Sequence, residues 1–118
     1  MVRKNFSKEI SNFTTYSQFL EDYILFYIFY DVKNGFYIDV GANDPNHFSV
    51  TKAFYLRGWH GINIEPLPDK YRSLLLYRNR DINLNIGAGE NQRNATLYLM
   101  RGGSTTKKQY INKKKKKL

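Results

Sequence analysis

The chain has no cysteine among its 118 residues. Disulfide bonds, thiolate metal sites and a cysteine nucleophile are therefore excluded. The longest apolar run, Tyr23 to Tyr30, is far shorter than the roughly 20 residues that a membrane-spanning helix needs. The N-terminal residues carry scattered charges and lack the apolar stretch of a secretory signal. From these absences we expect a cytoplasmic protein without a membrane span.

Positive charge is abundant, but it is concentrated at one end of the chain. The formal net charge is +9 at pH 7, and seven lysines lie between Lys107 and Lys117. Residues 1–106 carry twelve Lys and Arg against ten Asp and Glu, so this part is nearly neutral. A lysine run with no interleaved aromatic residue other than Tyr110 is typical of a solvated tail and indicates no specific nucleic-acid partner. A tail that binds nucleic acid or an anionic membrane surface is the alternative.

The composition predicts one small folded domain. Hydrophobic residues make up 42% of the chain and aromatic residues 16%, which is enough to build a core. Its length allows a single core. We therefore expect three parts, which are a flexible arm at 1–14, a folded segment at 15–101 and a disordered Lys-rich tail at 102–118.

Strands and helices are predicted to alternate after an N-terminal helix. That helix is expected at 16–30, where Thr15 and Gln18 have the spacing of a capping box. Ser49 is placed to cap a later helix, and Gly58 to end it. The remaining pattern predicts strands at 36–40, 61–65 and 82–86, with helices at 49–57 and from Pro68 to about 79. Such alternation indicates an α/β fold with a parallel sheet and a ligand beyond the carboxyl ends of its strands. A further β-prone run at 95–100 is expected to pair antiparallel with the third strand.

The turn after the first strand is the first candidate site. Asp39 places a carboxylate at the end of this strand, and Gly41 allows a ligand to approach the backbone closely. Glu65 follows the second strand, 24 residues after Gly41. This is close to the spacing at which an acidic residue binds the ribose hydroxyls in nucleotide-binding units. The simpler alternative is an ordinary turn with a solvated carboxylate.

The residues after Gly41 bear on the choice of cofactor. The later glycines of a dinucleotide-binding motif are missing, because Ala42, Asn43, Asp44 and Pro45 follow. A pyrophosphate would find no backbone cradle, and there is no P-loop. The pattern therefore disfavours NAD and favours S-adenosylmethionine, whose ribose needs an acid and whose methionine end suits carboxylates and backbone amides.

Four blocks of the sequence resemble FkbM-family methyltransferases and occur in the order of that family. They are YSQFLEDYILF (Tyr16 to Phe26), GFYIDVGANDPNHFSVTKAFYLRGW (Gly35 to Trp59), GINIEPLPDKYRSL (Gly61 to Leu74) and RDINLNIGAGE (Arg80 to Glu90). The resemblance implies a Rossmann-like class I methyltransferase fold that uses S-adenosylmethionine. The expected reaction is O-methylation of a sugar, a polysaccharide or a secondary metabolite, so the expected partner is a small-molecule or glycan acceptor.

The resemblance also implies roles for particular residues. Asp39 and Gly41 correspond to the first cofactor-binding motif, and Glu65 to the acid that binds the ribose. Other positions that match the cofactor region are Asn43, Asp44 and Ser49, near the methionine end, and Asn85, near the adenine. Residues of the N-terminal block could close over the cofactor, or they could form a polar helix face (Gln18, Glu21 and Asp22). No catalytic base and no metal ligand are identified.

The sequence departs from the family after its third strand. It offers no candidate for the strand that lies on the other side of the first strand in a class I fold, so we expect an incomplete fold. The strand at 36–40 would then be a free edge, open to self-association. We interpret the lysine run as a sign of a truncated reading frame. A catalytically inactive binding module is the alternative.

Overall fold

The computed structural model describes residues 3–100 and 103–105. The chain divides into two compact units, Met1–Ala88 and Gly89–Leu118, which are described separately. Within the described residues, no helix is both long enough and apolar enough to cross a membrane.

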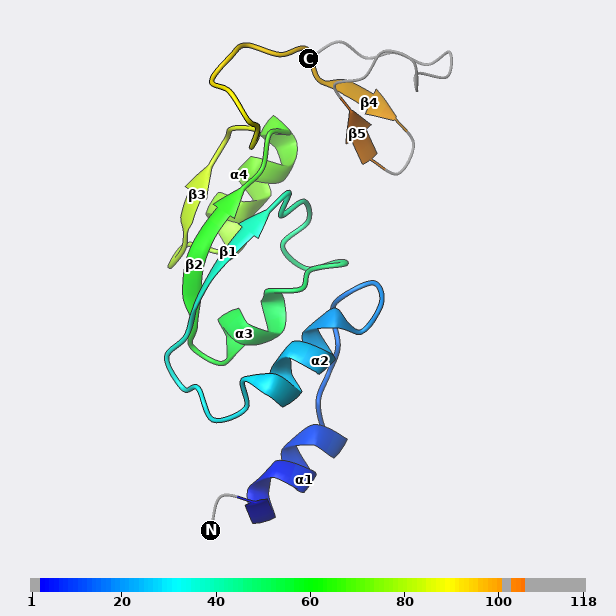
Figure 1. The fold of residues 1–118 in the computed structure, drawn as a ribbon, viewed down its shortest axis with the longest axis vertical. Helices are drawn as coiled ribbons and strands as arrows, with labels where there is room; N and C mark the ends of the chain where they lie inside the picture. Colours follow the sequence, from blue (N-terminus) through cyan, green and yellow to red (C-terminus); the bar gives the residue numbers. More distant parts are fainter. Residues whose placement is uncertain (1–2, 101–102, 106–118) are drawn as a thin grey trace. The chain divides into compact units, whose positions relative to one another are not determined.

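A parallel three-stranded sheet forms the centre of the first unit. Its strands are β1 (Phe36–Val40), β2 (His60–Ile64) and β3 (Ile82–Leu84), in the order β1-β2-β3 (Figure 1). The register pairs Ile38 with Ile62, and Ile62 with Ile82. The three strands and their parallel arrangement confirm the α/β prediction, and the sheet is consistent with a Rossmann-like fragment. Because β2 lies in the middle, β1 is an edge strand.

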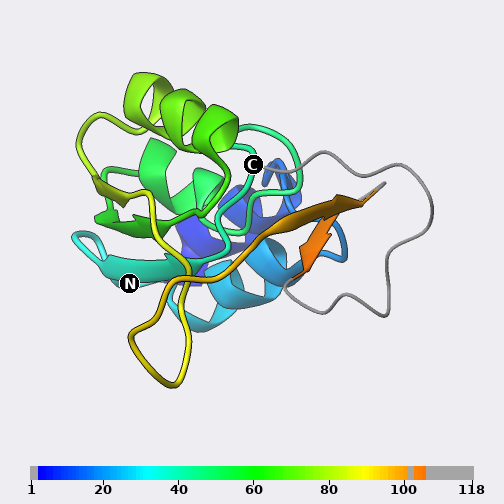
Figure 2. The ribbon, with the colours of Figure 1, turned by 90° about the horizontal axis from the view of Figure 1, so that it is seen from above.

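Two helices follow the strands and pack against the same face of the sheet (Figure 2). Helix α4 (Pro68–Tyr77) begins at Pro68 as predicted, because proline suits the first turn of a helix. Helix α3 (Lys52–Leu56) is shorter than expected and starts after Thr51. The Ser49 hydroxyl still accepts a hydrogen bond from the Lys52 N–H at 3.2 Å. Gly58 follows α3 with a φ of +93°, which confirms its predicted role.

The N-terminal segment differs from the expectation in two places. Residues predicted to form an irregular arm include the helix α1 (Arg3–Ser11). The next helix, α2 (Glu21–Ile28), begins at Glu21 and not at residue 16. The buried carboxylate of Asp22 is the reason, because it accepts hydrogen bonds from the hydroxyl groups of Thr15 and Ser17 and so holds this segment as a loop. The predicted capping box is therefore wrong.

Aromatic side chains form the hydrophobic core between the helices and the start of the sheet. Phe26, Phe54 and Trp59 are its buried members. Phe13 stacks on Phe26 with ring centroids 4.6 Å apart, and Phe54 lies 4.9 Å from Trp59. Burial of large aromatic side chains supplies much of the stability of a small domain.

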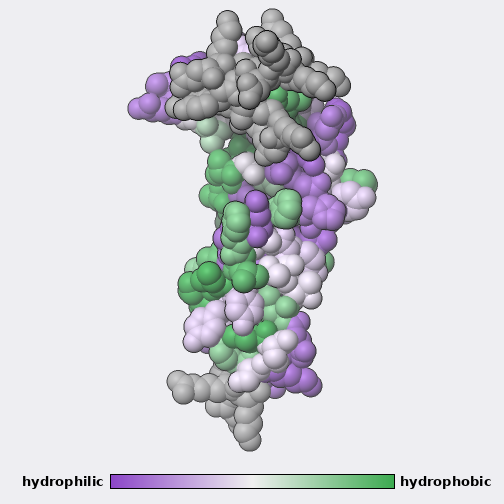
Figure 3. Space-filling view, turned by 90° about the vertical axis from the view of Figure 1, so that its right-hand side faces the viewer, coloured by the Kyte–Doolittle hydropathy of each residue, from purple (hydrophilic) through white to green (hydrophobic). Residues whose placement is uncertain are grey.

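The opposite face of the sheet carries apolar side chains that face solvent. Phe36, Ile38 and Val40 of β1 are 52%, 61% and 61% exposed. Ile82 and Leu84 of β3 extend this face. Hydrophobic residues also lie at the surface on the side of the molecule that Figure 3 shows. Among the described residues, helices cover only the other face of the sheet.

The second unit contains an antiparallel pair of strands. Strand β4 (Tyr98–Met100) pairs with β5 (Gly103–Thr105). The predicted pairing of residues 95–100 with the third strand is therefore wrong, because a nearer partner follows directly along the chain. The expectation that nothing after Arg101 is folded is also wrong for Gly103–Thr105. The rest of the predicted disordered tail, residues 106–118, lies outside the described residues.

Candidate cofactor site

Backbone hydrogen bonds join the turn after β1 to the end of β2. Gly41 has a φ of +76°, a conformation that favours glycine. The N–H groups of Gly41 and Ala42 both donate to the carbonyl oxygen of Ile64, at 2.8 and 3.1 Å. A Cβ added at Gly41 would meet no heavy atom within 4 Å. The space beside this turn is therefore open to a ligand.

Glu65 links the turn to the loop that follows β2. Its side chain is buried, with the residue only 3% exposed. Oε2 accepts the Asn43 N–H at 2.7 Å, and Oε1 accepts the Leu67 N–H at 2.8 Å. Its own N–H donates to the Leu84 carbonyl at 3.0 Å, at the end of β3. Each carboxylate oxygen thus accepts one hydrogen bond and keeps the capacity for another.

Asn85 lies against the backbone of Glu65. Its Nδ2 donates to the carbonyl oxygens of Glu65 and Pro66, at 2.9 and 3.1 Å. Together with Gly41 and Asn43, these residues meet at the carboxyl ends of the three parallel strands. This is the edge at which open α/β sheets bind ligands.

Asp44 occupies the same loop and is held in its charged form. Its Oδ1 accepts the N–H groups of Asn46 and His47, at 2.9 and 3.0 Å, and Lys70 Nζ lies 3.0 Å from Oδ2. Partial burial alone would raise the pKa of Asp44. The hydrogen bonds and the Lys70 ammonium outweigh that effect and lower the pKa to about 2. The loop therefore keeps a fixed negative charge.

Asp39 and Ser49 lie between the sheet and the helices, away from the open side of the turn. Asp39 Oδ2 accepts the Thr51 hydroxyl at 2.7 Å. Ser49 is 2% exposed, and its hydroxyl oxygen accepts Nη2 of Arg78 at 2.8 Å. The predicted site residues therefore divide into a group at the edge of the sheet and this pair, of which Ser49 is buried and Asp39 partly buried.

Arg78 and Asp81 are the centre of a buried polar network that the sequence reasoning missed. Their side chains are 2% and 0% exposed, with Arg78 Nη1 3.9 Å from Asp81 Oδ2. The Tyr37 hydroxyl donates to Asp81 at 2.6 Å, and Asn63 Nδ2 donates to it at 2.9 Å. Burial, together with the hydrogen bond to Asp81, raises the pKa of Tyr37. The only sequence signal was an arginine in the last turn of a predicted helix, three residues before an aspartate.

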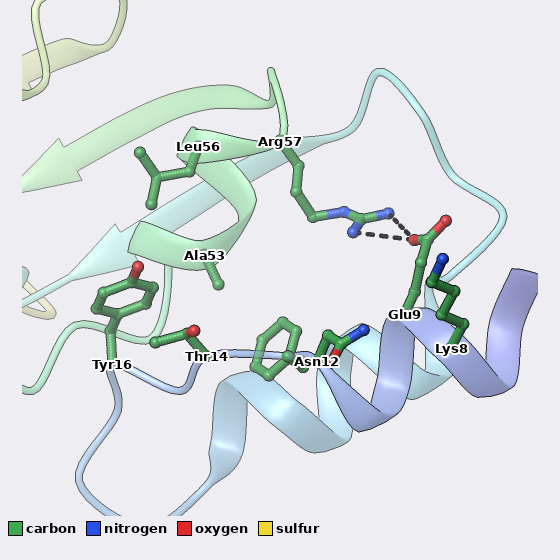
Figure 4. A pocket seen from close by; sticks show the side chains of 9 residues that line it. Lys8, Glu9, Asn12, Thr14, Tyr16, Ala53, Leu56 and Arg57 are labelled. Atoms are coloured by element: carbon green, nitrogen blue, oxygen red, sulfur yellow. Dashed lines mark hydrogen bonds and ion pairs between the residues drawn. The ribbon is translucent and has the colours of Figure 1, made fainter.

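Two cavities border the segment that joins α1 to α2. One, of about 430 Å³, lies between α1, α3 and the segment that joins α1 to α2, and Arg57 pairs there with Glu9 at 3.3 Å (Figure 4). The other, of about 360 Å³, lies beside the loop between β1 and α3. It is lined by Thr15, Tyr16, Ser17, Asn46, His47 and Phe48. None of the predicted cofactor residues lines either cavity. In the described ranges, no group of three or more histidine or acidic side chains could hold a metal ion.

The chain is an α/β protein with a cluster of polar residues at the carboxyl edge of a parallel sheet. The methyltransferase FkbM domain model matches residues 39–117, about two thirds of the chain. The chain therefore belongs to the FkbM methyltransferase domain family, which confirms the resemblance. All seven predicted cofactor residues fall within the matched range. No curated protein and no solved structure matches the chain.

Proposed function

We propose that this chain has a class I methyltransferase fold and binds S-adenosylmethionine at the carboxyl ends of β1 and β2. The observation that carries the proposal is the buried carboxylate of Glu65, held 2.7 Å from the Asn43 N–H beside the open turn at Gly41. A fixed acid next to a turn without side-chain obstruction suits an adenosine ribose. Membership of a methyltransferase family supports this choice of cofactor.

The residues present fit this cofactor. A ribose diol donates two hydrogen bonds, and the oxygens of Glu65 keep one acceptor position each. Because Glu65 is only 3% exposed, we infer that the ribose reaches it when the Asn43 N–H moves aside or shares the carboxylate. Asp44, with its lowered pKa, supplies a charged partner for the cofactor ammonium. When bound, the cofactor would supply an electrophilic methyl group.

The family also supports a proposal for the methyl acceptor. We infer that it is a hydroxyl group of a sugar, a polysaccharide or a secondary metabolite. A hydroxyl must lose its proton as it takes the methyl group, so a base is required. No residue of the described part is assigned that role.

Titration calorimetry with S-adenosylmethionine tests the cofactor proposal. The wild type is expected to bind saturably, and Glu65→Gln to bind about tenfold more weakly or worse, because one acceptor of the ribose diol is lost. Asp69→Asn is the matched control, because the side chain of Asp69 is 89% exposed on α4. NAD serves as the negative-control ligand, and we expect it not to bind. A folded wild type that ignores S-adenosylmethionine would refute the proposal.

A further inference from the structure

The guanidinium of Arg78 contacts the loop between β1 and α3. Arg78 caps the end of α4 and is only 2% exposed. Its Nη2 donates to the Pro45 carbonyl at 2.9 Å and to the Ser49 hydroxyl at 2.8 Å. Its Nη1 donates to the Thr51 hydroxyl at 3.3 Å. One planar group therefore contacts three residues of the segment between β1 and α3.

The contact with Thr51 extends to Asp39. Arg78 can only donate hydrogen bonds, so Thr51 Oγ1 must accept there. The single proton of the Thr51 hydroxyl is then directed to Asp39 Oδ2, at 2.7 Å. Arg78 thus holds two groups that flank the Gly41 turn. These are the Asp39 carboxylate before the turn and the Pro45 carbonyl group after it.

We propose that Arg78 is a positioning residue of the cofactor site, which sets the Gly41 turn through Thr51 and Asp39 on one side and through Pro45 on the other. The inference rests on the proposed binding of S-adenosylmethionine. A buried ion pair is by itself weak evidence for a role in stability, because apolar replacements of such pairs are often neutral or stabilising. What an apolar side chain does not reproduce is the fixed fork of donors that holds several acceptors in one geometry.

Arg80 provides a matched control. The guanidinium of Arg80 stacks on the ring of Tyr55 at 4.0 Å, and that of Arg78 stacks on the same ring at 4.9 Å. Arg80 also donates to the Tyr55 carbonyl. Its described hydrogen bond ends at α3, whereas those of Arg78 continue to the loop. A substitution at Arg80 therefore disturbs the same neighbourhood and leaves the loop contacts in place.

The first test compares Arg78→Lys with Arg80→Lys in the full chain. Lysine keeps the charge but lacks the planar fork. We expect Arg78→Lys to weaken S-adenosylmethionine binding about tenfold and Arg80→Lys to change it less than about twofold, by titration calorimetry. Thermal unfolding of each variant shows that it is folded. Wild-type affinity in folded Arg78→Lys would overturn the inference.

Thr51 gives a second test that leaves Arg78 in place. Thr51→Val removes the hydroxyl with little change in shape, whereas Thr51→Ser keeps it. We expect Thr51→Val to weaken S-adenosylmethionine binding about tenfold and Thr51→Ser to restore it. Rescue by serine separates positioning of Asp39 from simple packing. Equal affinities of Thr51→Val and Thr51→Ser would contradict the proposal that Arg78 positions Asp39 through the Thr51 hydroxyl.

Amide hydrogen exchange in the free protein separates this inference from the proposed function. Three N–H groups of the loop are hydrogen-bonded: that of Asn43 to Glu65, and those of Asn46 and His47 to Asp44. We expect their exchange to be faster in Arg78→Lys and Thr51→Val, and unchanged in Arg80→Lys. Faster exchange with no cofactor binding by the wild type would refute the function alone. Unchanged exchange in all variants would refute the positioning role.

Discussion

The carboxylate of Glu65 and the backbone N–H of Asn43 lie 2.7 Å apart and join the ends of two parallel strands. Asn43 has a positive φ of 54°, so this hydrogen bond also holds a strained backbone conformation. The acid proposed to bind the ribose therefore already shapes the turn beside it. Cofactor binding and loop conformation depend on the same carboxylate.

Replacing Glu65 by glutamine is expected to destabilise the fold. The Glu65 carboxylate accepts two backbone N–H groups, those of Asn43 and Leu67, whereas an amide has only one acceptor oxygen. One part-buried N–H would then lose its partner, so we expect the free energy of unfolding to fall by about 1 kcal/mol. Urea denaturation measures this change. Asp69→Asn, on the exposed side of α4, should leave stability nearly unchanged, and an equal loss there would argue against the explanation.

The lowered pKa of Asp44 predicts a loss of stability in acid. The folded protein holds this pKa at about 2, below its ordinary value of 3.8. Between these two pH values the unfolded chain binds the proton first, so stability present at higher pH is lost as the pH falls. The contribution is at most about 2 kcal/mol above pH 4, and the side chain is 26% exposed.

Asp44→Asn isolates this contribution, because asparagine keeps an acceptor oxygen but cannot titrate. The difference in unfolding free energy between wild type and Asp44→Asn should be greatest near neutral pH and shrink towards pH 2. Lys70→Met should reduce the difference, since the ammonium helps to lower the pKa of Asp44. A difference that is constant with pH would show that Asp44 is not responsible.

The features that depend on local sequence patterns could be predicted from the sequence. The three strands follow from short β-prone runs, and Pro68 and Gly58 mark helix ends because their backbone geometry allows little else. Gly41 and Glu65 were predicted together because both follow strands that a parallel sheet places side by side. Their hydrogen-bonded connection through Asn43 agrees with that reasoning. Whether the seven predicted residues bind the cofactor stays a prediction.

Features that depend on long-range contacts could not be predicted. The hydrogen bonds of Arg78 join it to residues 27 to 41 positions away, and no local pattern shows where a buried guanidinium finds its acceptors. The predicted start of α2 failed for a related reason. Asp22 bonds back to Thr15 and Ser17, and this competes with the helix. Ser49 was placed near the methionine end of the cofactor by the family resemblance, and its hydrogen bond to Arg78 could not be predicted.

Gly61 is expected to tolerate no side chain. A Cβ at this position would collide with the backbone carbonyl and the ring of Tyr37 on the neighbouring strand. We therefore expect Gly61→Ala to lower the unfolding free energy by about 2 kcal/mol or more, measured by urea denaturation. Gly87→Ala is the control, because a Cβ there would meet no atom within 4 Å. Equal stability of the two variants would contradict this prediction.

The exposed edge of β1 leads us to propose self-association. Its outer backbone groups have no strand partner in the described sheet, and the exposed side chains of Phe36, Ile38 and Val40 continue onto β3. Two copies that pair along β1 would form one continuous sheet, with their apolar faces side by side. Exposed, hydrophobic edge strands commonly pair in this way. We expect a concentration-dependent dimer in sedimentation velocity experiments.

Ile38→Lys tests whether this association uses β1. A lysine on an exposed edge strand disfavours pairing, so the variant should stay monomeric at concentrations where the wild type dimerises. Leu56→Lys is the matched control, because Leu56 lies on α3 and is 60% exposed, against 61% for Ile38. It should dimerise like the wild type. If both lysine variants are monomeric, general hydrophobic association accounts for the dimer; if the wild type is monomeric throughout, the edge of β1 has no such role.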